Sequence, residues 1–324
     1  MTTEKKKGCG CSTSLIIIVS VVFLALFVFG FMSGAVGAAL FKSFPAPDWL
    51  KVPTPHVELP SEAILHFGDF KFSNTLLASL LTTAVLLSIA VAVKMRTRLI
   101  PGRFQAFVEL GLEALLNFVE SVAGKKYGRR FFPMIATIFL FVMFNAYLAL
   151  LPFFGTVLVH TEEGYVPLFR AANTDLNVPL AIALCAFVFI EFWGLKALGA
   201  GHYFSEFFNF GQFITGLREL FTGKLKNGIR DFLFGFINIF IGLIELLSHF
   251  IRIVSFTFRL FGNMTAGEIL LFMVAFLVPL VAGNGVYGLE LLVGVLQALI
   301  FAGLTLVFAT IAVKAGGDEG HEAH

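Results

Sequence analysis

Six apolar stretches, each long enough to cross a lipid bilayer as an α-helix, limit what this chain can fold into. A bilayer core of roughly 30 Å requires about 20 predominantly apolar residues in a helix. The stretches lie near residues 14–40, 74–94, 133–153, 177–196, 234–272 and 286–313. Hydrophobic residues make up 58% of the 324 residues and charged residues only 14%, and 41 residues are phenylalanine, so a soluble core could not bury the apolar side chains. The sequence therefore predicts an all-α polytopic membrane protein.

The first stretch has two interpretations. Its basic start, apolar run and small residues at 33–39 are typical of a secretory signal with a cleavage region, whereas its length is that of a membrane span. The chain is therefore predicted to have five or six transmembrane helices, and residue 45 onward lies outside in both cases. The predicted divisions are an N-terminal span or signal segment at 1–41, an extracytoplasmic segment at 42–73, a membrane domain at 74–313 and a polar cytoplasmic tail at 314–324.

The distribution of Lys and Arg predicts the orientation, because basic residues favour the cytoplasmic side of a membrane. Basic residues are frequent at the N-terminus and in the connections near 94–103, 125–130 and 196–230. The other connections, at 42–73, 154–175 and 282–285, contain only Lys42, Lys51, Lys71 and Arg170. Both termini are thus expected in the cytoplasm if the first span is retained.

Two further segments are apolar but interrupted by charge. Residues 103–123 carry apolar side chains around Glu109, Glu113 and Glu120, and residues 203–232 combine many Phe residues with Gly, Lys and Arg. This pattern is typical of amphipathic helices that lie at a membrane interface. We expect both segments to be cytoplasmic interfacial helices, which would also serve as ordinary connectors.

The fifth stretch is nearly twice the length that a span needs, so its helix must be tilted, kinked or extended beyond the bilayer. A short turn at 282–285 joins it to the sixth stretch. The last two spans are therefore predicted to form a long tilted hairpin.

Polar side chains gather on one face of the fifth stretch. At about 100° per residue, five of them fall within roughly 40° of Arg259 and form one stripe with it: Glu245, Ser248, Arg252, Ser255 and Asn263. Glu268 falls on the opposite face and His249 flanks the stripe, while Glu290 and Gln297 share a face of the sixth stretch. Ionisable side chains inside a span cost at least a few kcal/mol unless they meet a partner or water. These residues are therefore candidates for function.

Structural interpretations stand beside the functional one. Arg252 could extend to the interface, Asn263 and Gln297 could simply link helices, and Arg259 could pair silently with a glutamate. Arg259, however, lies seven residues deeper than Arg252, which is about 10 Å along a helix. Arg stays protonated at physiological pH, whereas a buried carboxyl group can bind and release protons. A permanent positive charge between titratable carboxylates is the chemistry of controlled proton passage, with entry and exit kept apart.

The segment around Arg259 resembles a known signature. Residues 255–268 read SFTFRLFGNMTAGE, which resembles the R-L-F-G-N-M-x-A-G-E signature of the a-subunit of the F-type (rotary) ATP synthase. Residues 296–305 read LQALIFAGLT and are similar to the L-Q-A-x-I-F-x-x-L-T segment of that family. The resemblance extends to Leu150-Leu-Pro152 and Asp175-Leu-Asn177 and covers roughly residues 70–313.

The resemblance implies roles for these residues. Arg259 corresponds to the essential stator arginine, which faces a carboxylate of the rotating c-ring. Glu268 and Glu290 correspond to an interacting titratable pair in the half-channel from the outside, where relatives often have one Glu and one His, so a shared proton is expected here. Glu245 corresponds to a carboxylate of the half-channel to the cytoplasm. The polar residues beside the arginine are Gln297, Asn263 and Ser255.

One position departs from the family pattern. Just before Leu150-Leu-Pro152, many relatives carry a polar or acidic residue, whereas this chain has Ala149. The outer half-channel is therefore expected to depend more on other polar residues nearby, which are Asn145, Asp175 and Asn177.

The resemblance also implies partners and a location. It implies the c-subunit ring, the b-subunit peripheral stalk, the rest of the complex, membrane lipid and protons, in a bacterial plasma (inner) membrane; whether protons or sodium ions are coupled stays open. A secondary transporter or channel and a structural scaffold are the alternatives. No cofactor or metal is expected, and the net charge of +2 gives no reason to expect nucleic acid. The chain lacks the G-x-x-x-x-G-K-[ST] phosphate loop, so we expect a non-catalytic subunit without an ATP site.

Overall fold

The structure is a computed structural model, and it describes residues 13–40, 61–67, 70–98, 101–161, 164–199, 203, 225–280 and 282–318. The chain forms two compact units. One consists of residues 1–59 and 265–293, and the other of residues 60–264 and 294–324. Cys9, Cys11 and the end of the polar tail lie outside the described residues.

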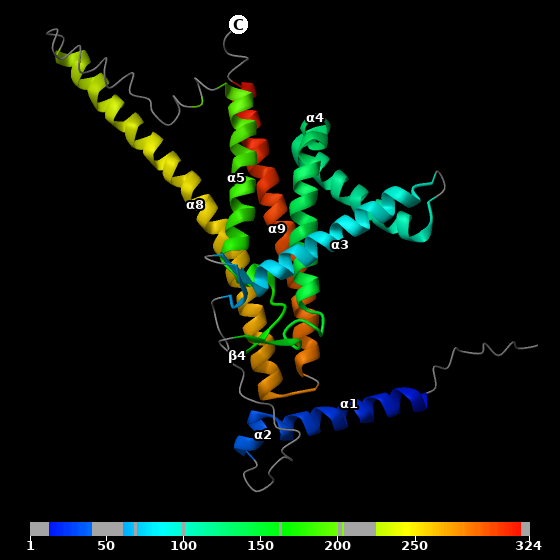
Figure 1. Ribbon diagram of the computed structural model, residues 1–324. Helices are drawn as coiled ribbons and strands as arrows, with labels where there is room; N and C mark the ends of the chain where they lie inside the picture. Colours follow the sequence, from blue (N-terminus) through cyan, green and yellow to red (C-terminus); the bar gives the residue numbers. More distant parts are fainter. Residues whose placement is uncertain are drawn as a thin grey trace, which may run out of the picture. The chain divides into compact units, whose positions relative to one another are not determined.

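Long helices dominate the described chain, which confirms the prediction of an all-α polytopic membrane protein (Figure 1). Six of the described helices are long and apolar enough to cross a membrane. The helices are α1 (Thr13–Ser33), α2 (Ala35–Leu40), α3 (Asn74–Arg96), α4 (Arg103–Ala149), α5 (Asn177–Leu198), α8 (Leu225–Leu277) and α9 (Ala282–Asp318).

The turn between α8 and α9 comes earlier than predicted. It follows Leu277 and includes Pro279 and Leu280, whereas residues 282–285 already belong to α9. Proline cannot continue a helix without losing a backbone hydrogen bond, and Leu280 has a left-handed φ of 74°, which ends the helical path. The prediction gave weight to the glycines at 283 and 285 and missed this proline.

The first unit joins α1 to that turn. A Cβ atom at Gly30 would collide with the carbonyl oxygen of Pro279, and one at Gly34 with that of Leu277. Because glycine has no side chain, the end of α1 approaches the backbone of the turn that follows α8 closely at these two positions. The preceding part of α1 exposes its apolar side chains throughout.

The third predicted span and the first predicted interfacial helix are parts of α4. The helical path breaks at Gly124, which has φ 73° and ψ 163°, a conformation that glycine tolerates. Residues 103–123 are helical, as expected, and their location at a membrane interface stays a prediction. The second part ends at Ala149, four residues before the predicted end, because the residue before Pro152 is disfavoured in a helix.

The fifth predicted span is longer in the structure. Helix α8 has 53 residues, which corresponds to about 80 Å at 1.5 Å per residue. Residues 225–232 belong to α8 and not to a separate interfacial helix. The remainder of that predicted helix, residues 204–224, lies outside the described residues.

Two short antiparallel hairpins occupy connections that were predicted to lie outside the membrane. Strand β1 (Ala63–Phe67) pairs with β2 (Phe70–Ser73), and β3 (Leu158–Thr161) pairs with β4 (Gly164–Pro167). A 3₁₀ turn, η2 (Ala172–Thr174), then leads to α5. The Asn74 side chain donates to the carbonyl oxygen of Pro167 at 3.3 Å, which links the start of α3 to the second hairpin.

The core of the second unit lies between α4, α5, α8 and α9. Its fully buried large side chains include Phe131, Ile135, Ile190, Leu260, Phe301 and Leu306. Helices α5 and α9 run side by side (Figure 1), and a Cβ at Gly194 would lie 3.5 Å from the Cβ of Ala312. A Cβ at Gly294 would lie 3.0 Å from that of Ala146, so small residues also bring α9 close to α4.

Candidate functional site

Helix α8 carries the predicted polar stripe at the boundary between its packed and exposed faces. Leu260 is completely buried, Phe258 is 57% exposed, and Arg259 between them is half-buried. The helix is continuous from Leu225 to Leu277, so residues three and four apart are neighbours on its surface. Arg259 therefore lies at the edge of the packed face, partly accessible and close to core residues.

The guanidinium of Arg259 has an unused donor. Its Nη1 atom is buried and has no hydrogen-bond partner among the described residues. The nearest aromatic contact is the Phe256 ring, whose centroid lies 6.0 Å from the guanidinium carbon. A buried unsatisfied donor costs about 1–3 kcal/mol, and more when it is charged. Such a group favours binding of an acceptor, preferably an anionic one, from outside the described chain.

Asn263 and Gln297 connect α8 to α9 next to this arginine. The Asn263 side-chain amide donates to Gln297 Oε1 at 3.3 Å, and Asn263 lies one helical turn beyond Arg259. Gln297 is only 4% exposed, and its Nε2 atom lacks a hydrogen-bond partner among the described residues. The structure thus brings together two predicted site residues that are 34 positions apart, and it leaves a second amide donor unused.

Glu290 lies against the backbone of α8 in the first unit. A Cβ atom at Gly267 would collide with the Glu290 carboxyl group, including its Cδ atom at 2.5 Å. Glu268, the residue after this glycine, is half-buried, as is Glu290. The absence of a side chain at Gly267 therefore provides the space that the carboxyl group occupies.

Polar residues also cluster where α4 and η2 meet. The Asn145 side-chain amide donates to Asn173 Oδ1 at 3.1 Å, and both residues are 1% exposed. Asp175 accepts from the Thr75 hydroxyl at 2.9 Å and from the backbone and side-chain nitrogens of Asn177 at 3.0 and 2.9 Å. The Asp175 carboxylate thus satisfies a free amide at the start of α5.

The structure does not bring every predicted residue into contact with another candidate. Within the described part of the chain, Glu245 is half-buried, while Ser248 and Ser255 are exposed, and none of the three bonds another candidate residue. Among the described candidates on α8, Asn263 is the one that bonds a candidate residue of α9.

The sequence reasoning missed an ionisable pair that joins α5 to α8. His249 Nδ1 lies 2.6 Å from Glu191 Oε1, and Glu191 also interacts electrostatically with Arg252. The rule that flags charges inside spans applies to Glu191 as well. Thr75 and Asn173 were also missed, because short polar side chains near span ends carry little signal alone.

A metal site finds no support in the described residues. Among them, no group of three or more His, Cys, Asp or Glu side chains could hold a metal ion. Cys9 and Cys11 lie outside that part of the chain.

Comparison with known proteins gives one consistent result. The family described as ATP synthase A chain matches this chain over residues 76–310. A protein named ATP synthase subunit a from Rhodopseudomonas palustris (strain BisA53) is 29% identical over 269 residues, which cover 78% of this chain and 93% of that protein. Proteins of the same name from Helicobacter acinonychis (strain Sheeba) and Helicobacter pylori (strain Shi470) are each 28% identical over 241 residues, 74% of this chain and 89% of theirs.

Proposed function

This chain belongs to the ATP synthase A chain family, and from that membership we propose that it is the proton-conducting stator subunit that couples proton passage to rotation of a c-subunit ring. It is a multi-pass membrane protein of the F-type ATP synthase complex. In this proposed mechanism, two offset half-channels lead to the ring from opposite sides of the membrane, and an arginine lies between them.

The unused donor of Arg259 is the observation that carries the proposal. Its buried Nη1 has no partner among the described residues, so an acceptor from a neighbouring subunit that entered the packed face beside the half-buried Arg259 would relieve an unfavourable arrangement. A carboxylate on a c-ring helix has the required charge, and an arginine–carboxylate hydrogen bond is about twice as strong as a neutral one.

We assign the outer half-channel to Glu268 and Glu290, with Asn145, Asp175 and Asn177 as further polar residues. The family resemblance supports this assignment, and so does the partial burial of both glutamates within an apolar helix pair. Their carboxyl groups can accept a proton from water and pass it to a ring carboxylate. Once neutral, that carboxylate can enter lipid, which its charged form could not do cheaply.

We assign the inner half-channel to Glu245, with Ser255 between it and Arg259 on α8. After nearly a full rotation, the ring carboxylate would lose its proton toward Glu245. Arg259 would then attract the charged carboxylate and block direct passage of protons between the half-channels. Each proton carries about 2.3 kcal/mol per 100 mV of membrane potential, so several protons per ATP suffice for synthesis.

The remaining assignments follow from the same family. We propose that the c-ring and the b-subunit peripheral stalk contact residues 74–313, that the complex lies in a bacterial plasma membrane, and that residues 314–324 form a cytoplasmic tail. The arrangement of basic residues supports both termini on the cytoplasmic side.

Replacing Arg259 with Ala tests the proposal. The complex with this substitution should assemble, yet proton-driven ATP synthesis in liposomes should fall by at least about 10²-fold, because a preorganised charge at a reacting group is typically worth that much. Arg129→Ala is the control: Arg129 is an exposed arginine that bonds Glu120 at 3.0 Å, and an exposed pair contributes at most about 1 kcal/mol. Retained coupling in the assembled Arg259→Ala complex would refute the stator assignment.

A further inference from the structure

An ionisable pair lies within two membrane spans and outside the path described above. His249 Nδ1 on α8 and Glu191 Oε1 on α5 are 2.6 Å apart, and their side chains are only 17% and 21% exposed. A contact this short between a carboxylate and an imidazole nitrogen is a strong, charge-assisted hydrogen bond. The two residues are 58 positions apart, so only the packing of α5 on α8 creates the pair.

Arg252 supplies a permanent charge beside this pair. It interacts electrostatically with Glu191, and its guanidinium carbon lies 4.0 Å from the centroid of the Phe308 ring on α9. Arg252 therefore lies over an aromatic face and within electrostatic range of an anion, and both stabilise a cation. With Arg252 positive and Glu191 negative, the net charge of the group depends on whether His249 is protonated.

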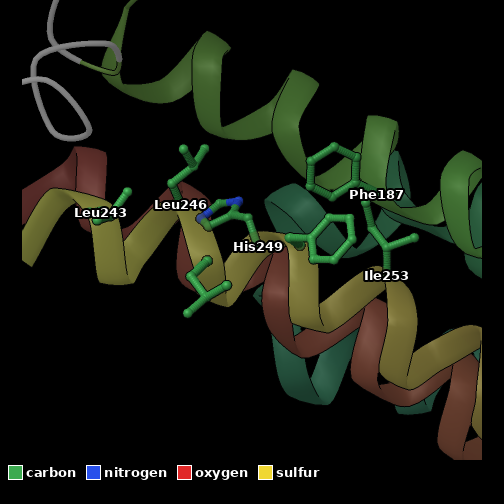
Figure 2. A pocket seen from close by; sticks show the side chains of 7 residues that line it. Phe187, Leu243, Leu246, His249 and Ile253 are labelled. Carbon is green, nitrogen blue, oxygen red and sulfur yellow. The ribbon is translucent and has the colours of Figure 1, made fainter.

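The surroundings of His249 are apolar. An open groove of about 590 Å³ lies beside it, lined by Phe187, Leu243, Leu246, Leu247, His249, Phe250 and Ile253. Figure 2 shows the imidazole ring among Leu243, Leu246, Phe187 and Ile253. The Phe187 ring meets the imidazole edge to face at 6.2 Å. Because apolar walls screen charge poorly, the interaction between Glu191 and His249 is stronger here than it would be in water.

The pair also lies beside the assigned inner half-channel. His249 is four residues after Glu245 on α8, so the two side chains are neighbours on one helix face. Further along α8 come Arg252 and then Arg259. Among the described residues, charged groups near the imidazole include Glu191 from α5 and Glu245 and Arg252 from α8, while α9 contributes the Phe308 ring beneath Arg252.

We propose that Glu191 and His249 form a proton-holding station of the inner half-channel, which exchanges protons with Glu245 and lies near the permanent charge of Arg252. This inference rests on the proposed function. Neutral His249 donates its Nδ1 hydrogen to the Glu191 carboxylate, and a proton that arrives from Glu245 binds at Nε2. Release returns that proton from Nε2, and the imidazole becomes neutral again. One proton is gained and lost in each cycle, and no covalent bond other than N–H and O–H changes.

A purely structural link between α5 and α8 predicts a different behaviour, and two double variants separate the two roles. Glu191→Gln with His249→Gln retains two groups that can hydrogen-bond but holds no titratable proton. Glu191→His with His249→Glu exchanges the two residues and retains a titratable pair. A structural link needs only the hydrogen bond, whereas a station needs the proton.

The experiment measures ATP-driven proton pumping by the assembled complex in liposomes, as the pH on the side of the soluble head is varied. Rates are normalised to ATP hydrolysis in the same sample after the membrane is made permeable to protons. A positioned proton-transfer group contributes about 10²–10⁴-fold to a rate-limiting transfer, so we expect the Gln–Gln chain to pump at least about 10²-fold more slowly at neutral pH and above. The exchanged chain should recover to within about twofold of the wild type.

The control is Thr257→Val on α8. The Thr257 hydroxyl donates to the carbonyl oxygen of Ile253 at 2.9 Å, so this change alters a polar side chain of the same helix without touching the pair. It should pump at the wild-type rate. If the Gln–Gln chain does not assemble, His249→Gln alone replaces it, since it leaves the attraction between Glu191 and Arg252 in place and has the same expected result.

The outcomes separate this inference from the proposed function. A Gln–Gln complex that pumps like the wild type at every pH, or an exchanged chain no faster than the Gln–Gln chain, overturns the station. If Arg259→Ala abolishes coupling in the same series, the stator assignment stands without it. If Arg259→Ala retains coupling, the proposed function itself is wrong, and the station is withdrawn with it.

Discussion

Adding one methyl group at Gly267 should move the Glu290 carboxyl group without unfolding the chain. A Cβ at this position would lie 2.5 Å from Glu290 Cδ, whereas ordinary contact begins at 3.4 Å. The carboxyl carbon must therefore move by at least 0.9 Å, the difference between these two distances. Because it is the end of a flexible side chain, this movement is cheap. Ala is also about 1 kcal/mol more favourable than Gly inside a helix, so the stability of the complex should not fall.

Proton transfer should be affected far more than stability. A displacement of about 1 Å in a reacting group can cost up to about 10²-fold in rate. We expect Gly267→Ala to lower proton-driven ATP synthesis in liposomes by about tenfold to 10²-fold, with the thermal midpoint of the complex unchanged. Adding Glu290→Asp, which shortens the side chain by one methylene group, should restore part of the rate.

Gly288 on α9 provides a matched control, because a Cβ there would meet nothing within 4 Å. Gly288→Ala should synthesise ATP like the wild type. If Gly267→Ala also does so, then the position of the Glu290 carboxyl group does not limit proton passage, and the reasoning from this contact is wrong.

Two further predictions concern the stability of the second unit, measured by unfolding the full chain in mixed micelles with increasing SDS. Asn145→Leu leaves Asn173 Oδ1 buried without its present donor and should cost about 1–3 kcal/mol; adding Asn173→Leu should recover most of this loss, and a double variant as unstable as the two single losses combined would contradict it. Phe301→Ala removes a fully buried ring whose centroid is 4.9 Å from that of Phe256 and should cost about 3–5 kcal/mol. Ile311→Ala, at a 57% exposed position of the same unit, should change stability by less than about 0.5 kcal/mol, and equal losses for the two would refute the assignment of the core.

The positions of the helices could be predicted because apolar length is a local property. A run such as 177–196 contains enough apolar residues to require a membrane span, and the structure has a helix at Asn177–Leu198. Errors arose where one residue decides the backbone path. Pro279 moved the turn of the last hairpin, whereas the break in α4 at Gly124 directly follows the predicted end of segment 103–123.

The short hairpins had a weaker local signal. Gly68-Asp69 separates two short runs rich in apolar residues, and a glycine followed by aspartate at such a place is typical of a tight hairpin turn. The prediction from the sequence covered the long apolar runs and included no strands in the connections. Hairpins with strands of four or five residues also need contacts with neighbouring elements for stability, such as the bond from Asn74 to Pro167.

For the candidate site too, the identity of the residues could be predicted from the sequence, whereas their contacts could not. The sequence predicted that Arg259, Asn263 and Glu290 lie in spans where polarity is costly, because this depends only on the residues and their helical spacing. Which side chains meet depended on how the helices pack. The bond from Asn263 to Gln297 and the pair of Glu191 and His249 each join two helices.

By itself, therefore, the sequence determined that the chain crosses a membrane, roughly where its helices lie and which charges are costly there, since hydropathy and a 3.6-residue period are readable one segment at a time. Only the tertiary structure decided that an Arg259 donor is left unused, that Glu290 fills the space over Gly267, and that His249 meets Glu191. Burial and hydrogen-bond pairing depend on the distance between atoms of different helices, and helical periodicity contains no information about the neighbouring helix.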